Sequence, residues 1–121
     1  MTVSRLQIQE LIDKWQGELG LSNWKIAIEI ISQKQIEKIY DKNCGNAAIT
    51  VNRLEETVIL HISRPNKDLE FSVLHELFHL VLYDYDAFAG HYIPEKEKRA
   101  YDIMLDNTIN KLVNITLKLK S

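Results

Sequence analysis

Two histidines and a glutamate stand in a stretch of the chain that is otherwise apolar. The segment VLHELFHLVLYDYD, residues 73–86, contains His75, Glu76 and His79 in the pattern HExxH. On an α-helix, residues four apart share a face, so both imidazoles can reach one ion at about 2.0–2.1 Å, the distance typical of zinc. Glu76 points about 100° further round the helix. We therefore predict two zinc ligands and a general base that acts on a neighbouring water.

The residues around the motif help to separate a zinc site from a chance match. A chain of this composition contains HExxH by chance in roughly one case in a hundred. From Phe71 to Leu82 the other residues are apolar, apart from Ser72. A helix that is apolar nearly all round is buried, and an uncompensated buried carboxylate costs several kcal/mol. Glu76 is therefore expected to have a partner or a chemical role.

A zinc site of this kind needs a third protein ligand, and helical phase selects Glu97. It shares one face of the segment 95–112 with mostly apolar residues, namely Ala100, Tyr101, Met104, Leu105, Thr108 and Leu112. Glu95 shares the other face with charged residues, namely Lys98, Arg99, Asp102 and Asp106. We expect the first face to point inward and the second to point to solvent. The alternative for Glu97 is an ordinary acid at a helix start.

Two other side chains offer alternative ligands. The pattern HExxHxxGxxH would need glycine and histidine where Leu82 and Tyr85 stand, so His91 is not that ligand. His91 is expected to line the site from a loop. Cys44 can bind zinc as a thiolate, although a small buried core cysteine is the simpler interpretation.

The periodicity of apolar residues predicts the elements that must position these groups. The class is α+β: a helix, three strands, the HExxH helix, a loop and a last helix. A short helical turn is expected within residues 32–46, and the last two strands are expected to form a hairpin. The expected elements are a helix from Ser4 to about Leu19, strands Trp24–Ile31, Ala47–Asn52 and Thr57–Ser63, a helix from Asp68 to about Tyr83, and a helix from Pro94 to about Leu117.

Composition limits the function classes. The chain has 121 residues, enough for one compact domain spanning 1–121. Its formal net charge of −2 argues against a basic surface for nucleic acid. One cysteine permits no intrachain disulfide and favours a reducing compartment. We find no signal-peptide core and no run of 18 apolar residues. We expect a soluble cytoplasmic protein with neither nucleic-acid nor membrane partners.

HELFH, the α+β elements before it and the ExxA of Glu97–Ala100 resemble the small gluzincin-like metallopeptidases, which include the minigluzincins and related prophage or mobile-element enzymes. There is also a distant resemblance to the peptidase domain of the ImmA/IrrE regulators. In those regulators Asn or Asp often follows the alanine, whereas this chain has Tyr101. Their helix-turn-helix domain is also missing here, so the minigluzincin-like interpretation is preferred.

The resemblance implies a compact zincin-like fold, in which a three- or four-stranded mixed, twisted sheet lies over the HExxH helix and a glutamate helix. It implies a zinc metallopeptidase whose Zn²⁺ is bound by His75, His79 and Glu97. Glu76 would be the general base that later passes the proton to the leaving amine. The substrate would be a peptide or protein segment held in extended form along an edge strand. His91 and Tyr92 are the candidates for stabilising the oxyanion, with Tyr83 and Tyr101 as further options.

Two other functions remain open. One is a latent or inactive zinc-binding regulatory module of a mobile element, which binds its partner without cleaving it. The other is a metal-free scaffold in which HELFH is accidental. A peptidase of this type can also inhibit itself, either through a dimer or through the C-terminal tail NITLKLKS, residues 114–121, whose pattern is β-like. The simpler interpretation of this tail is a helix end followed by a frayed terminus.

Overall fold

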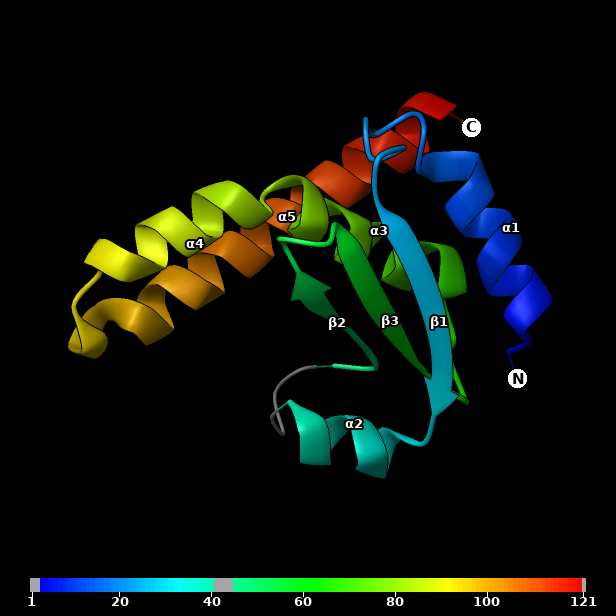
Figure 1. The fold of residues 1–121 in the computed structure, drawn as a ribbon, viewed down its shortest axis with the longest axis horizontal. Coiled ribbons are helices and arrows are strands. Elements are labelled where there is room, and N and C mark those ends of the chain that lie inside the picture. Colours follow the sequence, from blue (N-terminus) through cyan, green and yellow to red (C-terminus); the bar gives the residue numbers. More distant parts are fainter. Residues whose placement is uncertain (1–2, 41–44, 121) are drawn as a thin grey trace.

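The computed structural model describes residues 3–40 and 45–120 (Figure 1). Cys44 lies outside the described residues. The class is α+β, as predicted, with five α-helices and one three-stranded mixed sheet in the described part of the chain. In chain order the elements are α1 (Arg5–Trp15), β1 (Lys25–Ile31), α2 (Gln33–Ile39), β2 (Ala47–Asn52), β3 (Thr57–Ser63), α3 (Leu69–Val81), α4 (Tyr83–Tyr92), the 3₁₀ turn η1 (Glu95–Glu97) and α5 (Lys98–Lys120).

Local sequence explains where α1 begins and how it reaches the HExxH helix. Ser4 and Gln7 form a capping box, in which each side chain accepts a hydrogen bond from the other's backbone N–H. The helix then buries Ile8, Ile12 and Trp15. The indole N–H of Trp15 donates to Glu70 at 2.8 Å, and this bond ties α1 to the first turn of α3.

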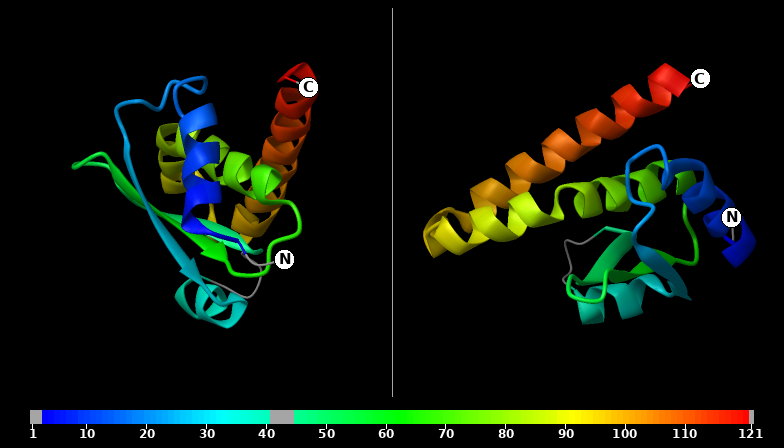
Figure 2. Two further views of the ribbon diagram at one scale, coloured as in Figure 1. Left: turned by 90° about the vertical axis from the view of Figure 1, so that its right-hand side faces the viewer. Right: turned by 45° about the horizontal axis from the view of Figure 1, so that its top comes forward.

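The sheet has the order β1-β3-β2. β3 pairs parallel with β1 and antiparallel with β2, so the predicted hairpin of the last two strands is confirmed. Inward-facing residues of β3 are almost fully buried, since Val58, Leu60 and Ile62 are 2%, 1% and 0% exposed. Helices α1 and α3 cover this face, and α2 covers the other (Figures 1 and 2).

The two edges of the sheet differ in whether their outward backbone groups have a hydrogen-bond partner. At the β1 edge, the guanidinium of Arg5 donates to the carbonyl oxygen of Ile28 at 2.7 Å. At the β2 edge, residues 47, 49 and 51 occupy the positions whose backbone groups point away from β3. Within the described residues these groups have no backbone partner, so β2 presents an open edge.

The segment after α3 is helical, which corrects the predicted loop over residues 84–94. Asp84, Asp86 and Gly90 indicated a loop in the sequence, but α4 forms from Tyr83 to Tyr92. The two acids lie in its first turn, where their negative charges interact favourably with the helix dipole. The hydroxyl of Tyr101 donates to Asp86 at 2.7 Å and ties α4 to α5. In Figure 2 (right), α4 nearly continues the line of α3, and α5 returns alongside both.

The C-terminal segment is also helical, so the β-like alternative for the tail is wrong and the helix runs three residues beyond the predicted end near Leu117. Helix α5 continues to Lys120, and Ser121 lies outside the described residues. Ile109 and Val113 are fully buried, and Lys120 forms an ion pair with Glu18 at 3.3 Å. This packing holds the segment in a helix beside the α1–β1 connection (Figure 1). No described helix is long and apolar enough to cross a membrane.

Two isoleucines of α5 test which face of this helix packs in the core. Ile109 is 0% exposed and Ile103 is 51% exposed. We expect Ile109→Ala to lower the free energy of unfolding by about 2–5 kcal/mol, because it leaves a cavity against α3. Ile103→Ala should lower it by less than about 1 kcal/mol. Urea unfolding followed by circular dichroism measures both changes, and equal losses would contradict this phase.

Candidate metal centre

Helix α3 presents its two histidines to the neighbouring helix because its opposite face is anchored in the core. The carboxylate of Asp68 caps the helix by accepting from the N–H of Phe71 at 3.3 Å. Val73, Leu74, Leu77 and Leu80 are buried against the sheet and α1. The side chains of His75 and His79 therefore face α5, which packs along α3.

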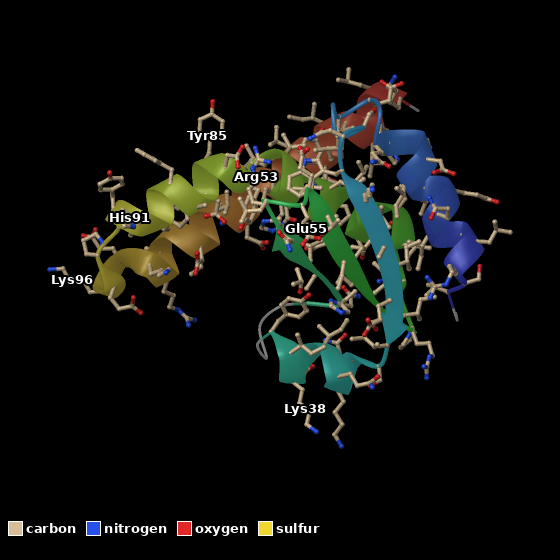
Figure 3. All side chains as sticks on the ribbon, in the orientation of Figure 1. Lys38, Arg53, Glu55, Tyr85, His91 and Lys96 are labelled. Atoms are coloured by element: carbon tan, nitrogen blue, oxygen red, sulfur yellow. The ribbon has the colours of Figure 1, made fainter. Side chains whose placement is uncertain are left out.

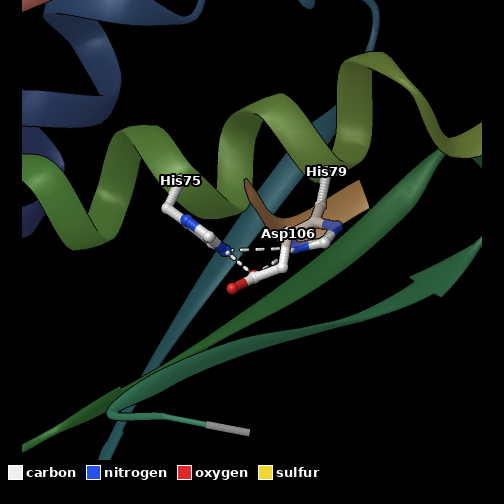
Figure 4. Close-up of side chains that lie close together, drawn as sticks. All are labelled: His75, His79 and Asp106. Carbon is white, nitrogen blue, oxygen red and sulfur yellow. Dashed lines mark hydrogen bonds and ion pairs between the residues drawn. The ribbon is translucent and has the colours of Figure 1, made fainter. Parts of the chain in front are cut away.

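Three ligand atoms converge between α3 and α5 (Figure 4). Nε2 of His75 lies 3.2 Å from Nε2 of His79 and 2.9 Å from Oδ1 of Asp106. Nε2 of His79 lies 4.0 Å from the same oxygen. The two imidazoles are 15% and 28% exposed, and the aspartate is 55% exposed. The group is therefore sheltered on the histidine side and open to solvent on the carboxylate side.

These separations fit ligands of a single cation. Three atoms that bind one tetrahedral zinc ion at about 2.0–2.1 Å are about 3.3–3.4 Å apart. Two imidazole nitrogens and one carboxylate oxygen also form a donor set that zinc accepts. Three lone pairs at such distances repel each other unless a proton or a metal ion lies between them. The three atoms are therefore close enough to hold one cation or to share a proton.

Asn110 orients the first histidine. Nδ1 of His75 lies 2.8 Å from Oδ1 of Asn110, one turn beyond Asp106 on α5. An amide oxygen can only accept, so Nδ1 carries a proton, and in the neutral imidazole Nε2 keeps its lone pair toward His79 and Asp106. The ring of Phe71 stacks on His75 with centroids 6.2 Å apart. Histidine ligands of metals commonly have such an outer partner.

The pKa values of Glu76 and His79 are both shifted in the direction that favours the neutral side chain. Burial raises the pKa of the Glu76 carboxyl well above its ordinary value, and the nearby charge of Asp106 raises it further. Its side chain has no hydrogen-bond or ion-pair partner among the described residues, although it is 7% exposed. Burial also lowers the pKa of His79, and a charge on His75 lowers it again. Neutral imidazole is the form that binds a metal.

A cleft of about 890 Å³ opens from the three ligands. One wall is the open edge of β2, with Ala47, Ile49 and Val51, and the floor is the HExxH face of α3. The other walls belong to α4, η1 and α5, with Tyr83, Asp86, Glu95, Lys98, Arg99, Asp102, Ile103 and Asp106 among their lining residues. The candidate cation site therefore lies at the floor of a surface cleft.

The structure does not bring the predicted third ligand, Glu97, to the two histidines. Glu97 lies in the turn η1, is exposed, and does not line the cleft, whereas Asp106 is the carboxylate that lies beside His75 and His79. The prediction counted phase through one α-helix from Pro94, but α5 begins at Lys98 after a 3₁₀ turn with three residues per turn. In addition, Met104 of the supposed inward face is 67% exposed.

The loop residues proposed as oxyanion stabilisers are also placed elsewhere. His91 and Tyr92 lie in the last turn of α4, both are exposed, and neither lines the cleft. Tyr83 does line it. Tyr101 is engaged with Asp86, and its pKa is raised to about 12 by its partial burial and by that carboxylate.

Sequence reasoning missed the roles of Asp106 and Asn110. Asp106 was assigned to a solvated face, and it is indeed exposed, but the solvent that it meets is in the cleft. Asn110 is four residues further along α5, a spacing that places both side chains on one face. A polar i, i+4 pair beside the buried Ile109 is the signal that the sequence offered.

Comparison of the chain with protein-family models, with curated proteins and with solved structures gives no match.

Replacing each acid in turn distinguishes the two candidate ligands. Loss of a residue that only hydrogen-bonds to a metal ligand weakens metal binding by roughly 10–100-fold. We expect Asp106→Ala to weaken zinc binding by more than this, because it would remove a ligand. Glu97→Ala should leave the affinity unchanged. Competition with a chromophoric chelator, using protein purified without a histidine tag, measures both. Weaker binding in Glu97→Ala alone would return the third ligand to that residue.

Proposed function

We propose that the protein is a zinc-dependent metallopeptidase of the small zincin-like type. The observation that carries the proposal is the convergence of His75, His79 and Asp106, whose facing atoms lie 2.9–4.0 Å apart at the floor of a cleft, beside the buried Glu76. The resemblance of HELFH to the gluzincin-like enzymes supports the same reaction class, with an aspartate in the place of the expected glutamate.

Each residue of the site has a separate task in this proposal. His75, His79 and Asp106 would hold the ion, and Asn110 fixes the tautomer of His75. A zinc ion bound there would act as a Lewis acid and would lower the pKa of a water in its open position toward about 7. Glu76 would accept a proton from that water at its carboxylate and would return it to the leaving amine.

The environment of Glu76 suits proton transfer. Its raised pKa, caused first by burial, makes its carboxylate a stronger base than a solvated one. The absence of a described hydrogen-bond partner leaves its oxygens free for a water in the cleft. Tyr83 lines the same cleft and is the tyrosine that we propose as a donor to the developing oxyanion.

The open edge of β2 provides the surface for the substrate. The outward backbone groups of Ala47, Ile49 and Val51 line the cleft and can pair with an extended peptide, as an added strand pairs with a sheet. The β1 edge is less available, since Arg5 binds Ile28 there. We therefore propose that a peptide or protein segment lies along β2, across the three ligands.

Replacing the general base tests the reaction. We expect Glu76→Gln to reduce hydrolysis of casein or of a peptide mixture by about 10²–10⁴-fold, because amide cannot accept the proton. Zinc content should stay at the wild-type level, since Glu76 is not a ligand. Elemental analysis beside the turnover assay checks both. Zinc in a wild-type protein that shows no turnover would support the alternative, a regulatory module that binds without cleaving.

A proline on β2 tests the docking edge. Ile49→Pro removes a backbone N–H that faces the cleft and leaves the bonds to β3 intact, a change that edge strands tolerate. We expect KM for a peptide substrate to rise by roughly fivefold, the equivalent of about 1 kcal/mol for one hydrogen bond, with little change in kcat. Thr50→Pro, which removes a bond to β3, is the control and should lower stability instead. An unchanged KM in Ile49→Pro would exclude this edge.

A further inference from the structure

The cleft ends where the turn between β2 and β3 meets the start of α4. Val51 is the last strand residue that lines it, and Tyr83, the first residue of α4, lines it on the helical side. Just beyond these two residues, the guanidinium of Arg53 donates to the carboxylate of Asp84, from Nε to Oδ1 at 2.8 Å and from Nη2 to Oδ2 at 3.3 Å. Figure 3 shows Arg53 beside α4. This bridge joins the two walls of the cleft and closes it at that end.

Arg53 occupies the place that an added strand would need beyond Val51. It is the next alternate residue of the open edge, whose outward backbone groups border the cleft as far as Val51. The guanidinium carbon of Arg53 lies 5.6 Å from the ring centroid of the buried Trp24, and its Nη1 lies 3.7 Å from Glu56. A cation held over an aromatic ring and between two carboxylates has little freedom to move away. An extended peptide can therefore pair with β2 only as far as Val51.

The two histidines lie close to this closed end. Helix α4 nearly continues the line of α3 (Figure 2), and Tyr83 follows His79 by four residues and His75 by eight. Tyr83 therefore lies about 6 Å and about 12 Å beyond them along the helix axis. A cation between the two histidines is then about 9 Å from the closed end, which is the length of about three residues of an extended peptide. On the other side of the candidate cation site, the surface continues into a hollow of about 230 Å³, lined by Gly45, Asn46, Ala47, Phe71, Ser72, His75, Glu76, Asp106 and Asn110. A bound peptide thus meets an end wall on one side only.

The charges beside the closed end suit the amino terminus of a peptide. Asp86, which is about one turn beyond Tyr83 on α4, lines the cleft together with Asp102. Lys98 and Arg99 also line it, but they precede Asp102 by about one turn of α5 and lie further from the candidate cation site. An ammonium group at the closed end therefore meets two carboxylates first. The direction of pairing agrees, because a strand added antiparallel to β2, the more stable arrangement, has its amino terminus at this end.

We infer that the protein shortens peptides from their amino terminus and releases fragments of about three residues or fewer. The inference rests on the proposed peptidase function and adds the class of substrate. The bound segment pairs with the open edge of β2, and its free ammonium group lies beside Asp86 and Asp102. The bridge between Arg53 and Asp84 excludes any residues that would precede that group. The interior of a long chain can take this position only if the bridge breaks.

Mass spectrometry of the products from peptides of several lengths tests the inference on the zinc-loaded full chain. We expect cuts within about three residues of a free amino terminus at every length. Acetylation of that terminus should lower kcat/KM by roughly tenfold or more, since a hydrogen bond to a charged group is lost, whereas amidation of the carboxyl terminus should leave it unchanged. Cuts spread along the peptides, or equal turnover of acetylated peptides, overturn the inference and leave the peptidase function standing. No cleavage of any peptide overturns both.

Opening the closed end gives a second readout on the same peptides. Asp84→Ala removes the bridge, and Glu56→Gln, which changes only the other carboxylate near Arg53, is the matched control. We expect Asp84→Ala to give roughly two- to fivefold more product cut beyond the third residue, the effect of losing one exposed ion pair. Glu56→Gln should match the wild type, and circular dichroism verifies that both variants are folded. The same cut positions and yields in both variants would contradict a cleft closed by this bridge.

Discussion

Three atoms with lone pairs, Nε2 of His75, Nε2 of His79 and Oδ1 of Asp106, are held at 2.9–4.0 Å from each other where α5 packs on α3. Bringing them together is unfavourable unless a proton or a metal ion lies between them, and the packing around them supplies the free energy that holds them in place. It comes from the opposite face of α3 and from Ile109 and Val113 of α5, which are fully buried. The candidate site is thus a polar seam held in place by the apolar contacts on either side.

Glu76 adds a second unfavourable term within the same helix. It is a carboxyl group in the buried part of α3, its pKa is well above the ordinary value, and it lacks a described partner. A leucine there would pack without this cost. Local features that oppose stability commonly mark functional sites, and here the carboxyl group lies beside the candidate cation site and lines the cleft.

The same principle accounts for the surfaces around the cleft. Arg5 partly covers one edge of the sheet, whereas the edge that borders the cleft is left open. Helix α4 contributes one side to the cleft through Tyr83 and Asp86, and its Asp84 closes one end of the cleft with Arg53. An open edge is a liability in solution, which is why it is interpreted as a place where another chain binds.

The sequence by itself determined the three strands, the two anchoring helices α1 and α3, and the trio His75, Glu76 and His79, because each depends on local periodicity or on spacing within one turn of helix. It did not determine which carboxylate lies beside the two histidines. Apolar residues occur all round α5, with Ile103 and Met104 exposed, so the phase of that helix follows from its packing on α3. That packing places Asp106, and not Glu97, next to His75 and His79. It also formed α4 from a segment with turn-favouring residues, because tertiary contacts such as the bond from Tyr101 to Asp86 outweigh weak local propensity.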